Sequence, residues 1–274
     1  MTTSWLAPCA LLLVAALVFV APTARGEDPV AVDDHGEAIT YRHGDVELQG
    51  WLQRPEGADS GARLPAVLVC HAWRGHGEFV RKVAQRLARD GYVAFALDMY
   101  GKGVYAKDNA EAAKLAGPFY TDAALIRGRA RAGLEVLRNR PEVDPARIGA
   151  VGFCFGGTTV LELSRDGAPL AAAVSFHGGL KTKAPAEAGA VKTRLLVCHG
   201  GDDPYVPAED VMALWKELRA AQVDHQILVL SGAVHAFTDT EAGDDPSQGA
   251  AYNAVAAHRA WDAADRFLAE ALDD

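Results

Sequence analysis

The sequence predicts an α/β fold, in which helices flank a mostly parallel central sheet. Short apolar runs that suit buried strands alternate along the chain with segments of helical periodicity. Strands and helices in this alternation form parallel sheets with right-handed crossovers. The chain has 274 residues, of which 50% are hydrophobic, and this suits one large domain of this kind. Functional sites in such sheets form at the carboxyl ends of the strands.

The expected strands and helices follow one another from residue 45 onward. Residues 45–53 alternate between apolar and polar side chains, as a half-exposed strand does. Continuous apolar runs predict further strands over 66–70, 92–97, 147–153, 171–176, 194–198 and 226–230. Helical spacing of apolar side chains predicts helices over 78–89, 121–138, 156–164, 208–221 and 248–272. Two loops, over 101–119 and 181–190, are expected to shape a substrate pocket.

The amino terminus is expected to be an export signal over residues 1–26. Residues 11–20 form an apolar stretch that is too short to span a bilayer comfortably. The tripeptide at 24–26, Ala-Arg-Gly, follows as a small-x-small site for signal peptidase. Residues 27–274 would then form a single domain that is periplasmic or secreted, without stable membrane association. The alternative is a signal that is retained as a membrane anchor.

Charge and cysteine content limit the partners and the disulfides. The formal net charge of −9 disfavours nucleic acid and anionic membrane surfaces. Cys9 lies within the predicted signal, so three cysteines remain and at least one has no intramolecular disulfide partner. Cys70 and Cys198 lie in apolar runs, which favours small core side chains over a disulfide between them.

The strongest local signal is the segment 152–157, with the sequence GFCFGG. It directly follows a predicted strand and begins a predicted helix, which is the setting of a nucleophile elbow with cysteine in place of serine. Gly152 and Gly156 are small enough to let strand and helix approach each other closely. The turn places Cys154 at a helix amino terminus, where the macrodipole favours a thiolate. The alternative is a buried structural cysteine beside a glycine-rich turn.

Two later loops carry an acid and a base. The segment 200–207 (GGDDPYVP) follows the strand that ends at residue 198, and it offers Asp202 and Asp203 as carboxylates that could orient a histidine. His235 lies on the loop after the strand at 226–230. Nucleophile, acid and base therefore occur in the chain order of α/β-hydrolases, each directly after a predicted strand.

The sequence resembles the dienelactone hydrolase family from about residue 39 to residue 268. The matching segments are HAWRG at 71–75, LDMYGKG at 97–103, GFCFGG at 152–157, GDDPYVP at 201–207 and AVHAF at 233–237. The resemblance implies an α/β-hydrolase fold and selects Asp203, which is nearest to the YVP, as the catalytic aspartate. It further implies that the backbone amides of Trp73 and Phe155 form the oxyanion hole.

Three positions depart from the better-known members of this family. Ala72 stands where those members have a glutamate that contacts the resting cysteine. Lys102 and Asp239 stand where they have arginines that hold a substrate carboxylate. These differences favour a substrate other than a dienelactone.

The sequence thus predicts a carboxylic ester hydrolase that acts on a small-molecule ester or lactone. Cys154 would attack the carbonyl and form a thioester, His235 would be the base, and Asp203 would orient His235. No cofactor is expected. One alternative is an esterase or thioesterase of another substrate class, and another is an exported, non-catalytic ligand-binding protein that retains the fold.

Other side chains at the strand ends are expected to line the substrate pocket. This set comprises His71, Lys102, Tyr105 and His177, with Trp73 and Phe119 as further apolar wall. The three histidines at 71, 177 and 199 all follow strands, but no cysteine or histidine lies near them at the tight spacing of a metal site. The sequence therefore does not predict a metal ion.

Overall fold

The computed structural model describes Met1, residues 36–56, Gly61 and residues 63–273. The described residues form an eight-stranded sheet with the strand order β1-β2-β4-β3-β5-β6-β7-β8. The six strands from β3 to β8 run parallel to one another, whereas β1 and β2 form an antiparallel edge, with β2 pairing antiparallel to β4. The predicted fold class, a mostly parallel sheet flanked by helices, is confirmed.

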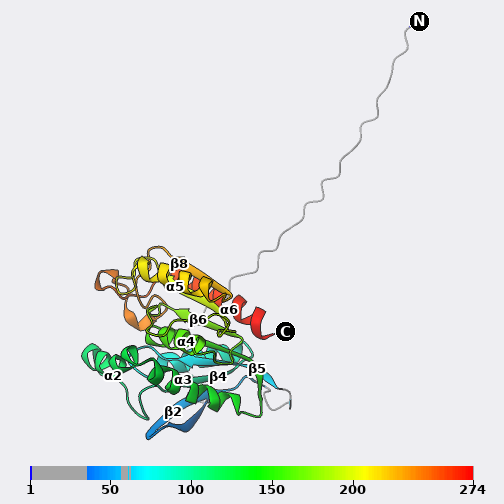
Figure 1. Cartoon of the computed structure of the whole chain (residues 1–274), viewed down its shortest axis with the longest axis vertical. Coiled ribbons are helices and arrows are strands. Elements are labelled where there is room, and N and C mark those ends of the chain that lie inside the picture. Colours follow the sequence, from blue (N-terminus) through cyan, green and yellow to red (C-terminus); the bar gives the residue numbers. More distant parts are fainter. Residues whose placement is uncertain (2–35, 57–60, 62, 274) are drawn as a thin grey trace. The chain divides into compact units, whose positions relative to one another are not determined.

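The chain enters the sheet at its antiparallel edge and then alternates between strands and helices (Figure 1). The strands are β1 (Glu37–His43), β2 (Val46–Gln53), β3 (Leu64–Cys70), β4 (Val93–Leu97), β5 (Val143–Phe153), β6 (Ala172–Phe176), β7 (Arg194–Gly200) and β8 (His225–Leu230). The helices are α1 (Glu78–Arg89), α2 (Asn109–Thr121), α3 (Ala123–Arg138), α4 (Phe155–Arg165), α5 (Ala208–Ala220) and α6 (Ala254–Leu272).

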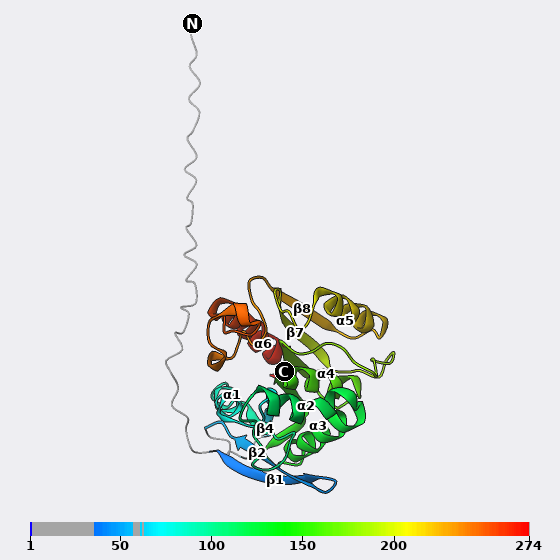
Figure 2. The same ribbon diagram turned by 90° about the vertical axis from the view of Figure 1, so that its left-hand side faces the viewer.

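Two hydrophobic cores lie on the two faces of the sheet. Figure 2 shows α1 and α6 on one face, and α3, α4 and α5 on the other. The side chains of α1 and α6 pack with alternate strand residues such as Val67 and Val151. Their neighbours Leu68 and Ala150 point into the opposite core with α3, α4 and α5. The central strands are apolar throughout because both of their faces are covered.

Three elements differ from the sequence-based expectation. The edge strand β1 (Glu37–His43) was not predicted, and its side chains are exposed or only half-buried. The region 101–119 is not all loop, because α2 begins at Asn109. The last helix begins after Asn253 instead of at residue 248, and the Asn253 side chain accepts a hydrogen bond from the amide of Ala256 at 3.0 Å. That cap fixes the start of α6.

The predicted export signal lies outside the described residues. Within the part of the chain that is described, no helix is both long and apolar enough to cross a membrane. Cys70, the last residue of β3, and Cys198, within β7, are buried free thiols, so the disulfide considered between them is not formed. Both are small core side chains.

The turn from β5 to α4 requires two glycines. A Cβ atom on Gly152 would lie 2.0 Å from the carbonyl oxygen of Gly156, and a Cβ atom on Gly156 would lie 2.0 Å from the carbonyl oxygen of Cys70. Both distances involve backbone atoms of neighbouring elements, which cannot move aside. The close approach of β3, β5 and α4 therefore depends on these two positions.

A pair of glycine substitutions tests this constraint. Gly156→Ala is expected to lower the free energy of unfolding by about 3 kcal/mol or more, because the added methyl group overlaps the backbone of β3. Gly117→Ala in α2 is the matched control, because a Cβ atom there meets nothing within 4 Å. It should be neutral or stabilising by roughly 0.5–1 kcal/mol. Urea unfolding measures both, and equal stabilities would contradict the packing argument.

Candidate active site

Cys154 occupies a strained turn at the carboxyl edge of the sheet. It is the amino-terminal cap of α4, with φ 52° and ψ −112°, a conformation that side-chain-bearing residues rarely adopt. Its backbone amide donates to the carbonyl oxygen of Phe176 at 3.0 Å and to Nδ1 of His177 at 3.1 Å. The residue is partly exposed, in contrast to Cys70 and Cys198. The turn thus presents this thiol at the surface of the sheet edge.

Asp203 and His235 meet on the loops after β7 and β8. Oδ2 of Asp203 accepts a hydrogen bond from Nδ1 of His235 at 2.8 Å. Oδ1 of the same carboxylate accepts from the amides of Tyr205 and Val206 at 2.8 and 3.2 Å. The carboxylate is fully buried, so these bonds fix its position. Asp202 is exposed, and its backbone amide only donates to the carbonyl oxygen of Ala233.

The imidazole of His235 interacts with both Cys154 and Asp203. Burial lowers the pKa of His235, but the negative charge of ionised Cys154 and hydrogen bonds to Asp203 and Cys154 raise that pKa to about 10. The imidazolium form is therefore favoured beside a thiolate. Because the folded pKa exceeds the ordinary value of 6.5, this proton stabilises the fold below pH 6.5, and the contribution is lost as the pH rises through about 10.

The backbone amides predicted for the oxyanion hole lie on two loops of the same edge. The amide of Phe155 follows Cys154 at the first residue of α4, and neither it nor the amide of Trp73 donates to another described residue. The hydroxyl of Tyr100 donates to the carbonyl oxygen of Trp73 at 2.9 Å. This bond holds the loop after β3 in place. Its ring also stacks on that of Phe155, with 5.5 Å between centroids.

His177 lies beneath the elbow and not in a pocket wall. It is 1% exposed, and its Nδ1 accepts the amide proton of Cys154. The ring proton must therefore be on Nε2, which donates to Oγ1 of Thr238 at 2.8 Å. Burial and the neighbouring His235 hold the pKa of His177 well below its usual range. A neutral imidazole thus joins the turn at Cys154 to the loop that carries His235.

His71 is likewise a structural residue of the loop after β3. It is 0% exposed, its Nδ1 donates to the carbonyl oxygen of Ala72 at 2.7 Å, and its Nε2 accepts from the amide of Met99 at 3.1 Å. Burial lowers the pKa of His71, which agrees with this neutral state. Ala72, where relatives were expected to have a glutamate, is half-buried against the core on the α1 and α6 face.

Lys102 and Tyr105 contact residues other than the triad. The ammonium of Lys102 pairs with Glu47 at 3.1 Å, and both side chains are about half exposed. Tyr105 is 45% exposed and forms a bridge with Gly75. Asp239 is closer to the site, on the loop after His235, and burial raises its pKa above the ordinary value. The structure therefore brings together Cys154, Asp203 and His235, whereas the described contacts of Lys102 and Tyr105 are with Glu47 and Gly75.

Two residues near the site, Tyr100 and Tyr120, were not assigned a role from the sequence. Tyr100 and Tyr120 surround Phe155, and the charge of Cys154 adds to burial in raising the pKa of both tyrosines. The imidazole of His199, a residue already noted in the sequence, has a buried Nδ1 that has no hydrogen-bond partner among the described residues. Tyr120 lies on α2, whose start carries a capping pattern that could have revealed it: Asp108 accepts from the amide of Glu111 at 2.9 Å.

Metal ligands do not cluster in the described part of the chain. No group of three or more His, Cys, Asp or Glu side chains there is arranged to hold a metal ion. The histidines at 71 and 177 use both ring nitrogens in hydrogen bonds to neighbouring groups.

A cysteine on a strained strand-to-helix turn, with an Asp–His pair on the loops after later parallel strands, places this protein among the α/β-hydrolases. Within that class it belongs to the dienelactone hydrolase family, whose sequence pattern matches residues 48–272. The solved structure named m3DLH is 38% identical, with a TM-score of 0.82, over 86% of this chain and 98% of that one. A dienelactone hydrolase-like promiscuous phosphotriesterase from metagenomic libraries is 40% identical, with a TM-score of 0.80 and the same coverage. A protein of Aquifex aeolicus named "Putative carboxymethylenebutenolidase" is 28% identical over 85% of this chain and 97% of its own length.

Neighbouring aspartates allow a matched test of the Asp–His pair. Asp203→Asn removes the charge that holds the His235 proton, so the thiolate of Cys154 loses part of its counter-charge. We expect alkylation of Cys154 by iodoacetamide at pH 7 to slow by about tenfold, since one pKa unit changes the charged fraction by that factor. Asp202→Asn, one residue away and exposed, should react like the wild type. Equal rates in the two variants would refute the assignment of Asp203.

Proposed function

We propose that this protein hydrolyses carboxylic esters or lactones through a Cys154–His235–Asp203 triad and a thioester intermediate. The observation that carries the proposal is the 2.8 Å bond between His235 and Asp203, combined with the effect of Cys154, whose negative charge raises the pKa of His235. The Cys154 thiol is the exposed member of three described free cysteines, and it lies at a helix amino terminus. These are the requirements for an activated nucleophile.

In the acylation step, the sulfur of Cys154 attacks the carbonyl carbon, and the carbonyl oxygen becomes an oxyanion. The amides of Phe155 and Trp73 are the donors proposed to stabilise that charge. The tetrahedral intermediate collapses, the bond to the alcohol oxygen breaks, and His235 gives its proton to the departing alkoxide. A thioester on Cys154 and a neutral imidazole remain.

Deacylation follows from the same electrostatics. Once the sulfur is acylated it carries no charge, so one of the causes that raise the pKa of His235 disappears. The neutral imidazole can then take a proton from water, while Asp203 keeps it oriented. The resulting hydroxide attacks the thioester and expels the Cys154 thiolate. The starting pair of thiolate and imidazolium is restored.

The substrate class follows from the leaving group. The tetrahedral intermediate can expel either the Cys154 thiolate or the leaving group of the substrate, and it expels the thiolate more readily when that leaving group is poor. Activated esters and enol lactones are therefore favoured over amides. The name of the Aquifex aeolicus relative describes hydrolysis of a butenolide, which is an enol lactone. That name supports an ester or lactone substrate for this chain.

A burst experiment separates an enzyme from a non-catalytic binding protein of the same fold. Wild-type protein is expected to release a burst of p-nitrophenol from p-nitrophenyl acetate. Cys154→Ala should abolish the burst and lower the turnover rate by at least about a thousandfold. Cys198→Ala, which changes a buried thiol, is the matched control and should retain the burst. Equal turnover in wild type and Cys154→Ala would refute the nucleophile.

We also propose that the protein is exported. The proposal rests on the apolar stretch at 11–20 and on the small-x-small site at 24–26. Expression in a bacterial host followed by fractionation and amino-terminal sequencing tests it. The expected product begins at residue 27 and is found outside the cytoplasm. A full-length product in the membrane fraction would favour the retained anchor instead.

A further inference from the structure

A hollow that the triad does not use lies beside the elbow, between α2, α3, α4 and the segment after β6. It has an empty volume of about 300 Å³, part of which is open to solvent. Its wall consists of Phe119, Tyr120, Ala123, Ile126, Thr158, Glu162 and residues 181–183. Because that volume includes open solvent, the hollow suits part of a substrate better than a whole cofactor.

The hollow begins next to Cys154 and extends away from it along α4. Tyr120 belongs to its wall, and the ring of Tyr120 packs edge-on against Phe155 with 5.7 Å between centroids. Thr158, another wall residue, donates its backbone amide to the carbonyl oxygen of Cys154 at 3.1 Å. Thr158 and Glu162 are one and two turns further along the helix, at rises of about 6 and 12 Å from Cys154.

The position of the hollow distinguishes the acyl side from the leaving-group side. His235 must face the departing oxygen in order to protonate it. None of the wall residues comes from the loops after β7 and β8, which carry Asp203 and His235. The hollow is therefore on the acyl side of the reacting carbonyl.

The wall is apolar near the elbow and basic at its outer rim. Phe119, Tyr120 and Ile126 supply aromatic and aliphatic surface. At the rim, the ammonium of Lys183 donates only to the carbonyl oxygen of Thr121, at 3.4 Å, and pairs with no carboxylate of the described residues. Lys181 pairs with Asp210 at 3.2 Å, but its side chain is 80% exposed, so the pair is weak.

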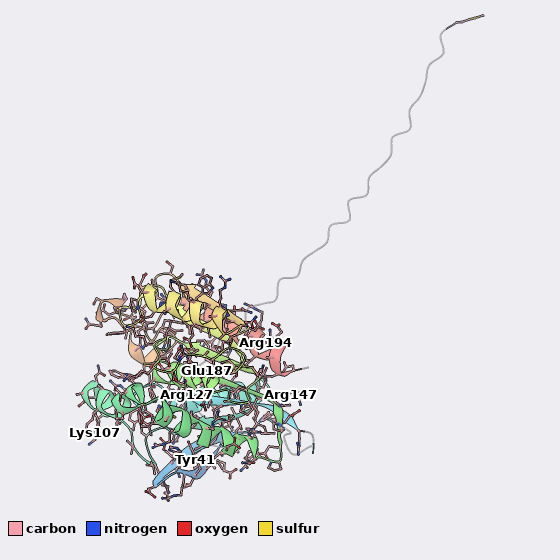
Figure 3. The ribbon with its side chains drawn as sticks, in the orientation of Figure 1. Tyr41, Lys107, Arg127, Arg147, Glu187 and Arg194 are labelled. Atoms are coloured by element: carbon pink, nitrogen blue, oxygen red, sulfur yellow. The ribbon has the colours of Figure 1, made fainter. Side chains whose placement is uncertain are left out.

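The one acidic wall residue is neutralised. Glu162 accepts from Arg127 at 2.8 Å and from Arg165 at 3.0 Å. Arg127, labelled in Figure 3, also donates to the carbonyl oxygen of Ala184 at 2.6 Å, which anchors the segment that carries the two lysines. The hollow therefore has an unmatched positive charge at its rim and no free negative charge in its wall.

We propose that this hollow binds the acyl tail of the substrate. The preferred tail is an aliphatic or aromatic group about six carbons long, and it ends in a carboxylate beside Lys183. The inference rests on the proposed function, because it assigns the acyl side by the position of His235. It names the substrate class as esters of such half-acids.

Filling the hollow tests its position. Ala123→Phe places a ring in the wall, whereas Ala124→Phe places the same ring on the exposed side of α3. For p-nitrophenyl hexanoate, kcat/KM should fall about tenfold in Ala123→Phe, because roughly two methylenes of the substrate are no longer buried. In Ala124→Phe it should stay unchanged. The ratio of hexanoate to acetate activity should therefore fall in Ala123→Phe and keep its wild-type value in Ala124→Phe. Ala123→Leu makes the same test with a smaller side chain if phenylalanine impairs folding.

The outcomes separate this inference from the proposed function. An unchanged ratio of hexanoate to acetate activity in Ala123→Phe or Ala123→Leu would overturn the position of the acyl tail, while the triad would stand. A wild type that hydrolyses neither ester would overturn the proposed function and this inference with it.

Removing the rim charge tests the substrate class. The monoester of adipic acid with p-nitrophenol has the same chain length as the hexanoate and adds a terminal carboxylate. Wild type should prefer it, and Lys183→Met should lower the adipate-to-hexanoate ratio of kcat/KM about threefold, the effect of one exposed ion pair. Lys192→Met, an exposed lysine near the opposite end of the sheet, should leave the ratio unchanged. The same ratio in Lys183→Met and wild type would overturn the anionic tail.

Discussion

The strained backbone at Cys154 is the constraint on which the rest of the site depends. The turn from β5 to α4 closes only because Gly152 and Gly156 have no side chain in a space where a Cβ atom would be 2.0 Å from backbone oxygen atoms. It holds Cys154 at φ 52°, and two further non-glycine residues with positive φ, His177 and Ala236, lie on the adjoining loops. Strain of this kind persists only where the surroundings over-determine the conformation. Here the surrounding sheet is apolar and covered on both faces.

A second constraint is electrostatic. Protonated His235 needs a negative partner on each side, and the buried carboxylate of Asp203 supplies one of them. His177 touches the same imidazole, with 5.3 Å between ring centroids, and must stay neutral. If His177 were charged it would repel His235 and could no longer accept the amide proton of Cys154. Burial keeps His177 neutral, so hydrophobic packing also sets the charge state of the site.

Sequence patterns specify the parts of this protein that depend on local rules. Apolar runs predict the strands β3 to β8 to within a few residues, and in the central strands this is because both faces must be apolar. The helix α1 (Glu78–Arg89) matches its predicted range, since its apolar and charged sides are clearly separated. The Cys154, Asp203 and His235 positions are also visible in the sequence, because each directly follows such a strand.

Other parts depend on tertiary contacts that no local pattern encodes. The helix α2 (Asn109–Thr121) contains Gly117 and Pro118, and it lacks a clear apolar stripe, so it was expected to be loop. Tyr120, which lies at its end near Cys154, was missed for that reason. Sequence position alone likewise suggested that His71 and His177 line the pocket. Their roles in fixing backbone loops become visible only when both partners of each ring are known.

The proposed mechanism requires a thioester on Cys154, and trapping this acyl-enzyme tests it directly. Wild-type protein is mixed with p-nitrophenyl acetate, quenched with acid during the burst, digested and mapped by mass spectrometry. We expect one acetyl group on the peptide that contains Cys154, and neutral hydroxylamine should remove it, as it removes a thioester. An acetyl group on any other side chain, or release of p-nitrophenol at full rate with no acylated Cys154, would contradict it.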